Sequence, residues 1–398
     1  MSKRTSDVYY DPYDYDIDAD PHPIWKRMRD ELPLYRNDRY DFWALSRFAD
    51  VESCSIDWRT FSSARGSVLE AILSGLPMPP GFILFEDPPI HDAHRGVLSR
   101  VFTPRRVAAL EPQIREICAQ ALDPFVGSSG FDFVRDLGAK LPMRVIGKLL
   151  GIPSERQEEV RDRFDRSMHI EDGDVSARAG MAAQQLSSGM DEFVSWRRQH
   201  PADDVITELI NATFVDDKDV ERQLSEEELV NYVTLLAAAG NETVTRLIGW
   251  TGYVLAKQPE QRAELVGDPL LVPGAIEEIL RYEAPSPVQA RLVTRDVDLY
   301  GSVVREGEIV LLLTGSANRD DRKFDDPDRF DIHRRIERHL SFGHGIHFCL
   351  GAALARMEGR VALEEVLKRF PTWQIDEPGA EMVHTSTVRG WERLPVVL

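Results

Sequence analysis

The sequence predicts a mainly α-helical fold with a small β-rich part, and three observations lead to this prediction. Residues 91–228 show helical periodicity, interrupted only by short Pro and Gly signals. A capping box at Ser225 opens an apolar-rich run that continues to Lys257, long enough for a helix of roughly 48 Å. Strand-like alternation is confined to residues 32–46 and 291–315. The 398 residues could form two lobes or one large domain with a minor sheet.

The N-terminal part is expected to contain a short helix, a hairpin and a long loop. The helix is predicted from Pro21 to Glu31, and the hairpin pairs residues 34–36 with residues 41–45. From Ser62 to Pro89, Gly and Pro break any helix, although many apolar residues remain. This loop could pack over the core or form a flap over an apolar ligand, and both alternatives stay open.

Two features of the helical part are ambiguous when taken alone. Residues 237–243 combine four small residues with an acid and a hydroxyl, which allows either tight helix packing or close approach of a flat ligand. Glu278 and Arg281 lie three residues apart on one helix face, a spacing typical of a surface ion pair. In addition, residues 168–188, rich in Gly and Ala, predict a mobile helix pair.

Composition excludes several classes of protein. The net charge of -19 argues against nonspecific nucleic-acid binding, which requires a basic face. Only three cysteines occur, far apart, so we expect a reducing compartment rather than a disulfide framework. The N-terminus lacks the apolar core of a signal peptide, and no apolar run approaches the roughly 18 residues of a membrane span. We therefore expect a cytoplasmic protein.

The loop from Ser341 to Arg356 carries the strongest chemical signal. Cys349 lies among three glycines and just before a run that predicts a helix from Ala352 to Phe370. The positive end of a helix dipole and free N–H groups favour a thiolate. Such a thiolate could join a zinc site with His339, His344 and His347, act as a nucleophile, or ligate a heme iron.

The pattern Phe342-x-x-Gly345-x-x-x-Cys349-x-Gly351, with His347 two residues before the cysteine, resembles the heme-binding signature of the cytochrome P-450 superfamily. Three further segments match in the expected order: Ala239 to Thr243 is similar to the oxygen-binding motif, Glu278-x-x-Arg281 to the ExxR motif, and Pro327 to Phe330 to the meander. The resemblance extends from Pro21 to Leu398. It implies one domain over residues 1–398 with the cytochrome P-450 fold, a triangular helical prism with a small β-rich portion that includes C-terminal strands.

The resemblance also implies roles for individual residues. Cys349 would be the axial thiolate ligand of heme b, and thiolate donation favours O–O cleavage. Glu278 and Arg281 would form a buried structural pair instead of a surface pair. Glu242 and Thr243 would deliver protons to iron-bound dioxygen. The remaining heme contacts would be Ala239, Gly240, Phe342, Gly345 and Gly351, together with the propionate contacts His91, Arg95, Arg291 and His347.

The implied function is insertion of one oxygen atom from O2 into an apolar small molecule such as a lipid, terpenoid, steroid or aromatic compound. Electrons would come from NAD(P)H through a ferredoxin reductase and a ferredoxin docked on a basic patch of Arg334, Arg335 and Arg338. Hydrogen peroxide-driven peroxygenase activity and non-catalytic heme sensing or carriage remain alternatives. The expected substrate-pocket residues are Leu76, Met78, Phe82, Leu235, Ala238, Val288, Gln289 and Thr387.

Overall fold

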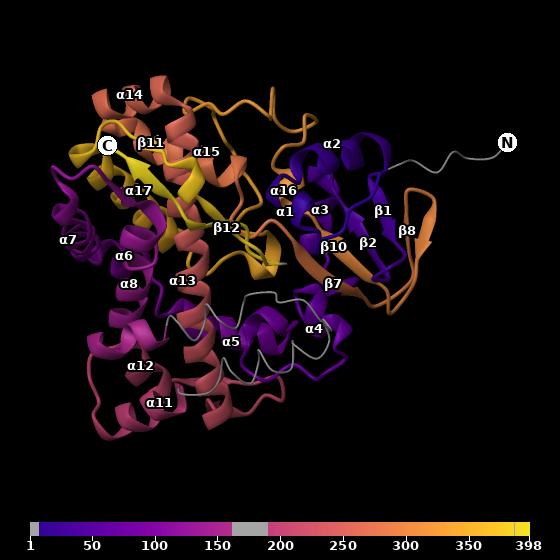
Figure 1. Cartoon of the computed structure of the whole chain (residues 1–398). Helices are drawn as coiled ribbons and strands as arrows, with labels where there is room; N and C mark the ends of the chain where they lie inside the picture. The colour runs from indigo at the N-terminus through magenta and orange to yellow at the C-terminus, as the bar shows by residue number, and fades with distance from the viewer. Residues whose placement is uncertain (1–7, 161–189, 386) are drawn as a thin grey trace.

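One long helix, α13 (Glu226–Lys257), runs through the centre of the helical part of the molecule (Figure 1). The Ser225 hydroxyl accepts a hydrogen bond from the Glu228 N–H at 3.2 Å, and the Glu228 carboxylate accepts one from the Ser225 N–H at 2.8 Å. This reciprocal cap satisfies two donors that the first helical turn leaves free. The predicted start and end of this helix are therefore confirmed.

The computed structural model describes residues 8–160, 190–385 and 387–398, so the predicted helix pair at residues 168–188 lies outside the described residues. The helices are α1 (Tyr15–Ala19), α2 (His22–Glu31), α3 (Phe48–Ile56), α4 (Leu69–Leu73), α5 (Ile90–Ser99), α6 (Pro104–Ala109), α7 (Glu111–Leu122), α8 (Leu141–Leu150), α11 (Met190–Gln199), α12 (Val205–Asn211), α13, α14 (Pro259–Gly267), α15 (Val272–Tyr282), α16 (Thr314–Ala317) and α17 (Ala352–Arg369). The strands are β1 (Leu34–Asn37), β2 (Phe42–Leu45), β3 (Phe61–Ser62), β4 (Gly130–Asp132), β5 (Thr213–Val215), β6 (Glu221–Gln223), β7 (Gln289–Val293), β8 (Val297–Leu299), β9 (Ser302–Val304), β10 (Ile309–Leu312), β11 (Gln374–Ile375), β12 (Glu381–Val383), β13 (Gly390–Arg393) and β14 (Pro395–Val397).

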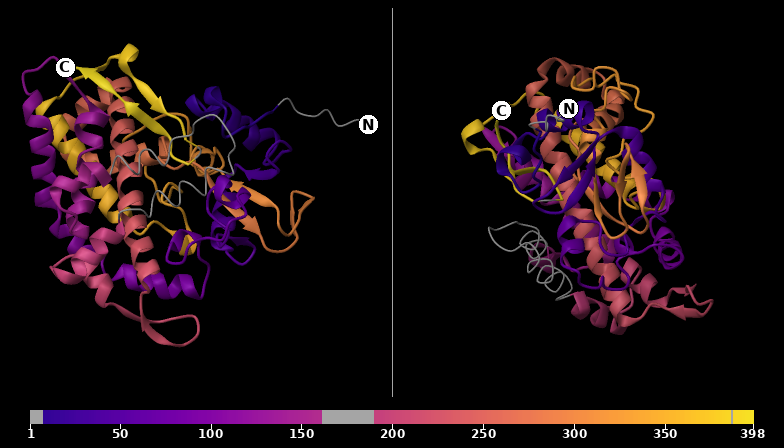
Figure 2. Two further views of the ribbon diagram at one scale, coloured as in Figure 1. Left: turned by 60° about the horizontal axis from the view of Figure 1, so that its bottom comes forward. Right: turned by 90° about the vertical axis from the view of Figure 1, so that its right-hand side faces the viewer.

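The main sheet joins two distant parts of the chain. Its strand order is β1-β2-β10-β7-β3, with β10 parallel to β2 and antiparallel to β7. Strands are confirmed in both predicted regions. β1, β2, β7 and β10 belong to the main sheet, which lies beside the helices (Figures 1 and 2), whereas β8 and β9 pair only with each other. Further strands near the C-terminus form the β12–β13 hairpin and pair β14 with both β11 and β4.

The apolar core surrounds α13 along its length. The C-terminal half of α13 packs with α7, α15 and α17, and its N-terminal half packs with α5, α8 and α11. Two smaller clusters fill the two faces of the main sheet. A buried helix with apolar residues on most sides is what the sequence of α13 predicts. The expectation of one domain over residues 1–398 stays a prediction.

The loop from Ser62 to Pro89 differs in part from its prediction, because Leu69–Leu73 forms the short helix α4. Gly66 and Gly75, both with positive φ, flank this helix instead of preventing it. Leu69 packs against the main sheet, whereas Phe82 joins the cluster around the N-terminal half of α13. At these positions the loop packs over the core.

None of the helices in the described parts of the chain combines the length and apolar character needed to cross a membrane. The cytoplasmic location stays a prediction.

Candidate functional site

A tight loop places Cys349 three residues before α17. The Cys349 N–H donates to the Phe342 carbonyl at 2.8 Å, which closes the loop. Gly343 and Gly345 have φ of +68° and +73°, which favours glycine at both positions. A Cβ at position 345 would lie 2.7 Å from the Ser55 carbonyl at the end of α3. Gly345 is therefore required by its backbone conformation and by close packing on α3.

The expected preference for a thiolate does not hold for the protein alone. Burial is the largest influence on Cys349 and raises the pKa of its thiol. The Gly351 N–H, Arg95 and Arg356 act in the opposite direction without reversing the shift. The Cys349 side chain is nevertheless exposed, although protein atoms surround it on most sides. A bound metal ion would supply the charge that replaces the proton.

Arg291 on β7 is a buried cation near this loop. It is only 6% exposed, and its guanidinium donates to the Ala290 carbonyl at 2.7 Å. Among the described residues, no carboxylate lies within ion-pair distance of it. Burial lowers the pKa of Arg291 to about 10, and Asp87 compensates only in part. An arginine buried with so little compensation is suited to a negatively charged ligand group.

Two histidines face each other beside Arg291. The rings of His91 and His347 meet edge to face with centroids 4.7 Å apart, and the buried Nε2 atom of each has no hydrogen-bond partner in the described structure. Burial lowers the pKa of His347 to about 2, with additional repulsion from Arg291, His91 and Arg95. Arg95, one turn after His91 on α5, donates to the Phe348 carbonyl at 2.5 Å.

These residues fit a heme with two propionates. Four nitrogen-bearing side chains from α5, β7 and the cysteine loop gather near Cys349, and unpartnered donors among them suit anionic oxygens. The zinc alternative does not fit: His339 binds Glu277, His344 lies 3.3 Å from Arg338, and the described residues contain no group of three metal-ligating side chains. Phe342 is buried and lies at the base of the loop.

The segment of small residues, 237–243, lies in the middle of α13. The Thr243 hydroxyl donates to the Ala239 carbonyl at 3.1 Å, the back-bond expected of a mid-helix Thr. A Cβ at Gly240 would lie 3.2 Å from Ile146 Cγ1, so this glycine serves tight packing on α8. Glu242 is 3% exposed and accepts a hydrogen bond from Arg246 at 2.7 Å.

Arg246 was not among the residues singled out in the sequence. It lies four residues after Glu242 on the same helix, a spacing that signals an acid–base pair. That signal was available, but it is weak, because the same spacing is also common in solvent-exposed pairs.

Glu278 and Arg281 form a pair with no exposed surface. Arg281 donates to both carboxylate oxygens of Glu278 at 2.7 and 2.8 Å, and to the carbonyls of Asn318 and Pro327 at 2.9 Å. The interpretation of a surface pair, based on spacing alone, is therefore wrong, because the long coil after α16 (residues 318–339) covers both side chains.

The same network corrects the expected basic patch. Arg334 is only 10% exposed and donates to Glu278 at 3.2 Å and to three carbonyls of the coil. It is a structural residue and is not available to a partner. Arg335 is exposed, and Arg338 is 46% exposed while pairing with Glu52.

The expected substrate residues fall in different surroundings. Phe82, Leu235 and Ala238 are buried around the N-terminal half of α13. Leu76 is 47% exposed, and Met78 is half-buried. The Gln289 amide donates to the Ser286 hydroxyl at 3.0 Å. The structure thus does not bring all eight residues together.

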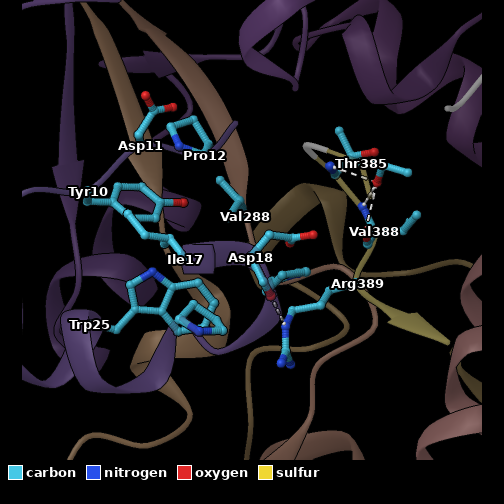
Figure 3. A pocket seen from close by; sticks show the side chains of 13 residues that line it. Tyr10, Asp11, Pro12, Ile17, Asp18, Trp25, Val288, Thr385, Val388 and Arg389 are labelled. Carbon is cyan, nitrogen blue, oxygen red and sulfur yellow. Dashed lines mark hydrogen bonds between the residues drawn. The ribbon is translucent and has the colours of Figure 1, made fainter. Parts of the chain in front are cut away.

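Val288 and Thr387 line a small cavity of about 20 Å³. Figure 3 shows it between Tyr10 and Trp25 on one side and the turn with Thr385 and Val388 on the other. A wider cleft of about 730 Å³ shares Arg389 with this cavity, and none of the expected substrate residues lines the cleft.

Comparisons with known proteins all point to one protein family. The family model described as cytochrome P-450 matches residues 269–386. Cytochrome P-450 123 of Mycobacterium tuberculosis is 40% identical over 410 residues, covering 100% of this chain and 99% of the relative. Cyclomarin C epoxidase CymV of Salinispora arenicola is 36% identical over 383 residues, covering 95% and 96% of the two chains.

Solved structures are similar along nearly the whole chain. A mutant of EryK in complex with erythromycin B has a TM-score of 0.87 at 34% identity and covers 95% of this chain and 96% of its own. CYP109E1 of Bacillus megaterium in complex with testosterone has a TM-score of 0.87 at 30% identity and covers 96% and 98%.

Proposed function

Because the chain belongs to the cytochrome P-450 superfamily and is a heme-thiolate monooxygenase of bacterial type, we propose that it inserts one oxygen atom into an apolar small molecule with electrons from a ferredoxin. The observation that carries the residue assignments is the group of buried, under-compensated nitrogen donors around the cysteine loop. Heme supplies the oxygen-activating chemistry when bound. The roles of the surrounding residues follow from their positions.

Cys349 holds the iron, and the Gly351 N–H stabilises negative charge on its sulfur. Arg291, His91, Arg95 and His347 hold the propionates. A carboxylate beside Arg291 would relieve the burial penalty that lowers the pKa of this arginine. Heme binding and local stability are therefore coupled at this position.

Glu242 and Thr243 move protons on α13. The Thr243 hydroxyl has one acceptor, the Ala239 carbonyl, and its lone pairs can accept from a group beside the helix. Glu242 is buried and paired, so it must leave Arg246 before it can pass a proton.

The substrate is apolar and of moderate size. Phe82, Leu235 and Ala238 offer an apolar wall at the N-terminal half of α13, whereas Val288 and Thr387 line a small cavity that none of these three residues lines. Two of the similar structures hold erythromycin B and testosterone, and the second of these is a steroid. A lipid, terpenoid, steroid or aromatic compound remains the range we propose.

The electron donor docks near Arg335 and Arg338, which precede the cysteine loop in the chain and stay exposed. Two cations in a chain of net charge -19 would attract an acidic donor locally. We predict that Arg335→Gln with Arg338→Gln slows reduction by the ferredoxin several-fold and flattens its dependence on salt. Arg329→Gln, an exposed arginine of the meander, is the matched control. Equal reduction rates in the double variant and the control would contradict this docking site.

The function is tested by supplying the protein either with ferredoxin, reductase and NAD(P)H or with hydrogen peroxide alone. Substrate-dependent NAD(P)H consumption with added ferredoxin and reductase, together with an oxygenated product, is expected for the monooxygenase. Product formation with hydrogen peroxide alone would favour the peroxygenase instead. Heme binding without product from either source would leave a sensor or carrier.

A further inference from the structure

The acid of the expected proton-delivery pair is held by a buried cation that also reaches a second carboxylate. Arg246 Nη2 donates to Glu242 Oε2 at 2.7 Å, and both side chains are 4% exposed. Arg246 Nη1 donates to the Trp391 carbonyl at 2.6 Å and to Glu392 Oε2 at 3.4 Å. One guanidinium therefore stands between an interior acid and an acid of β13.

The β12–β13 hairpin lies directly on this arginine. A Cβ at Gly390 would lie 2.9 Å from the Cβ of Arg246, so the strand can approach α13 this closely only with glycine there. Glu392, two residues later, is 40% exposed. Glu392, Arg246 and Glu242 consequently form a line from the protein surface to the middle of α13.

The energetics of the line favour an exchange of partners. A buried carboxylate beside a guanidinium stays ionised, because the opposite charge stabilises that form. Removing Glu242 from Arg246 would leave an uncompensated buried cation, which is strongly unfavourable. Glu392 is already within hydrogen-bond distance of Nη1, so Arg246 can keep a carboxylate partner while Glu242 moves.

We propose that Arg246 is a positioning residue that holds Glu242 ionised, and that Glu392 is the exchange partner that lets Glu242 turn toward Thr243. This inference rests on the proposed function, since it assigns Glu242 to proton delivery. It adds two residues to the proton-delivery machinery, Arg246 of α13 and Glu392 of β13.

The first test is Glu392→Gln, a change at a partly exposed side chain that leaves the fold intact. Without the competing carboxylate, Arg246 binds Glu242 more persistently, so kcat should fall about tenfold, equivalent to about 1.4 kcal/mol, while KM changes little. Glu381→Gln on β12, an exposed carboxylate of the same hairpin, is the matched control and should retain the kcat of the unmodified protein. Equal kcat values for the two variants would overturn the exchange.

The second test reads the ionisation of Glu242 directly and does not depend on turnover. Infrared difference spectra of the heme-loaded protein against Glu242→Gln assign the band of this side chain. At neutral pH it should be a carboxylate in the unmodified protein and in Arg246→Lys, and a protonated carboxyl in Arg246→Met. An unchanged carboxylate band in Arg246→Met would overturn the positioning role.

These outcomes separate the inference from the function on which it rests. If ferredoxin-supported turnover is absent in the unmodified protein, the proposed function fails whatever the infrared bands show. If turnover is present and both the kcat ratio and the band stay unchanged, the function stands and the inference is wrong.

Discussion

Two groups of buried charges in this protein differ in completeness. Around Arg281, each charge has a partner: Glu278 accepts at 2.7 and 2.8 Å, and two carbonyls accept at 2.9 Å. Around Arg291, a single backbone carbonyl accepts, and neighbouring His91 and His347 keep buried nitrogen atoms without partners among the described residues. A complete group stabilises the fold, whereas an incomplete one indicates where a ligand's charge belongs.

Whether a group is complete determines whether a substitution in it lowers or raises the free energy of unfolding. Removing one partner from the complete group leaves the other charge buried and uncompensated. Removing the cation from the incomplete group also removes the unfavourable free energy of burying it in the ligand-free protein. The substitution becomes unfavourable only when the ligand binds. Substitution of Arg281 should therefore lower the free energy of unfolding. Substitution of Arg291 should leave the free energy of unfolding equal or raise it, and should weaken binding of the ligand.

The largest effect is expected for Arg281→Ala. Loss of the guanidinium leaves Glu278 with only part of its partners and frees the carbonyls of the coil after α16, so the free energy of unfolding should fall by about 3–5 kcal/mol. Urea-induced unfolding followed by circular dichroism measures this change. Arg281→Lys, which keeps the charge but not the two-pronged geometry, should lose less. A loss below about 1 kcal/mol for the alanine variant would remove the distinction between the two groups.

A smaller effect is expected for Arg291→Met, which should not destabilise the heme-free protein but should weaken heme binding. In the heme-free protein the free energy of unfolding should stay equal or rise, because burial already lowers the pKa of this arginine to about 10. Heme should dissociate about tenfold faster or more, which at an unchanged association rate weakens binding by about 1.4 kcal/mol. Arg295→Met, an exposed arginine just after β7, provides the control for both measurements. Destabilisation of the heme-free protein without faster heme release would show that Arg291 is structural.

Much of the fold could be predicted because local signals and tertiary structure agree. The capping box at Ser225 determines where α13 begins, and alternation of apolar residues predicts β1, β2 and β10. The predicted helix after Cys349 also matches α17 within one residue. Helix α4 was missed, because packing of Leu69 and Ile72 on the sheet stabilises a turn that its flanking glycines disfavour.

The site was less accessible to sequence reasoning, since burial is a tertiary property. The spacing of Glu278 and Arg281 is the same in a solvent-exposed pair and a buried one, and only the family resemblance favoured the buried alternative. Arg334 looked like part of a basic surface, yet the coil folds it back onto Glu278. Burial raises the pKa of the Cys349 thiol more than the Gly351 N–H, Arg95 and Arg356 lower it, and this burial could not be seen in the sequence.

The central claim is that Cys349 is the axial thiolate of a heme held by Arg291, His91, Arg95 and His347. The most direct measurement is the absorption spectrum of the reduced carbon monoxide complex of the purified protein. The red-shifted band of a thiolate ligand is expected for the unmodified protein and should be absent in Cys349→His with heme still bound. A band that persists in Cys349→His, or that is absent from the unmodified protein, would contradict the assignment.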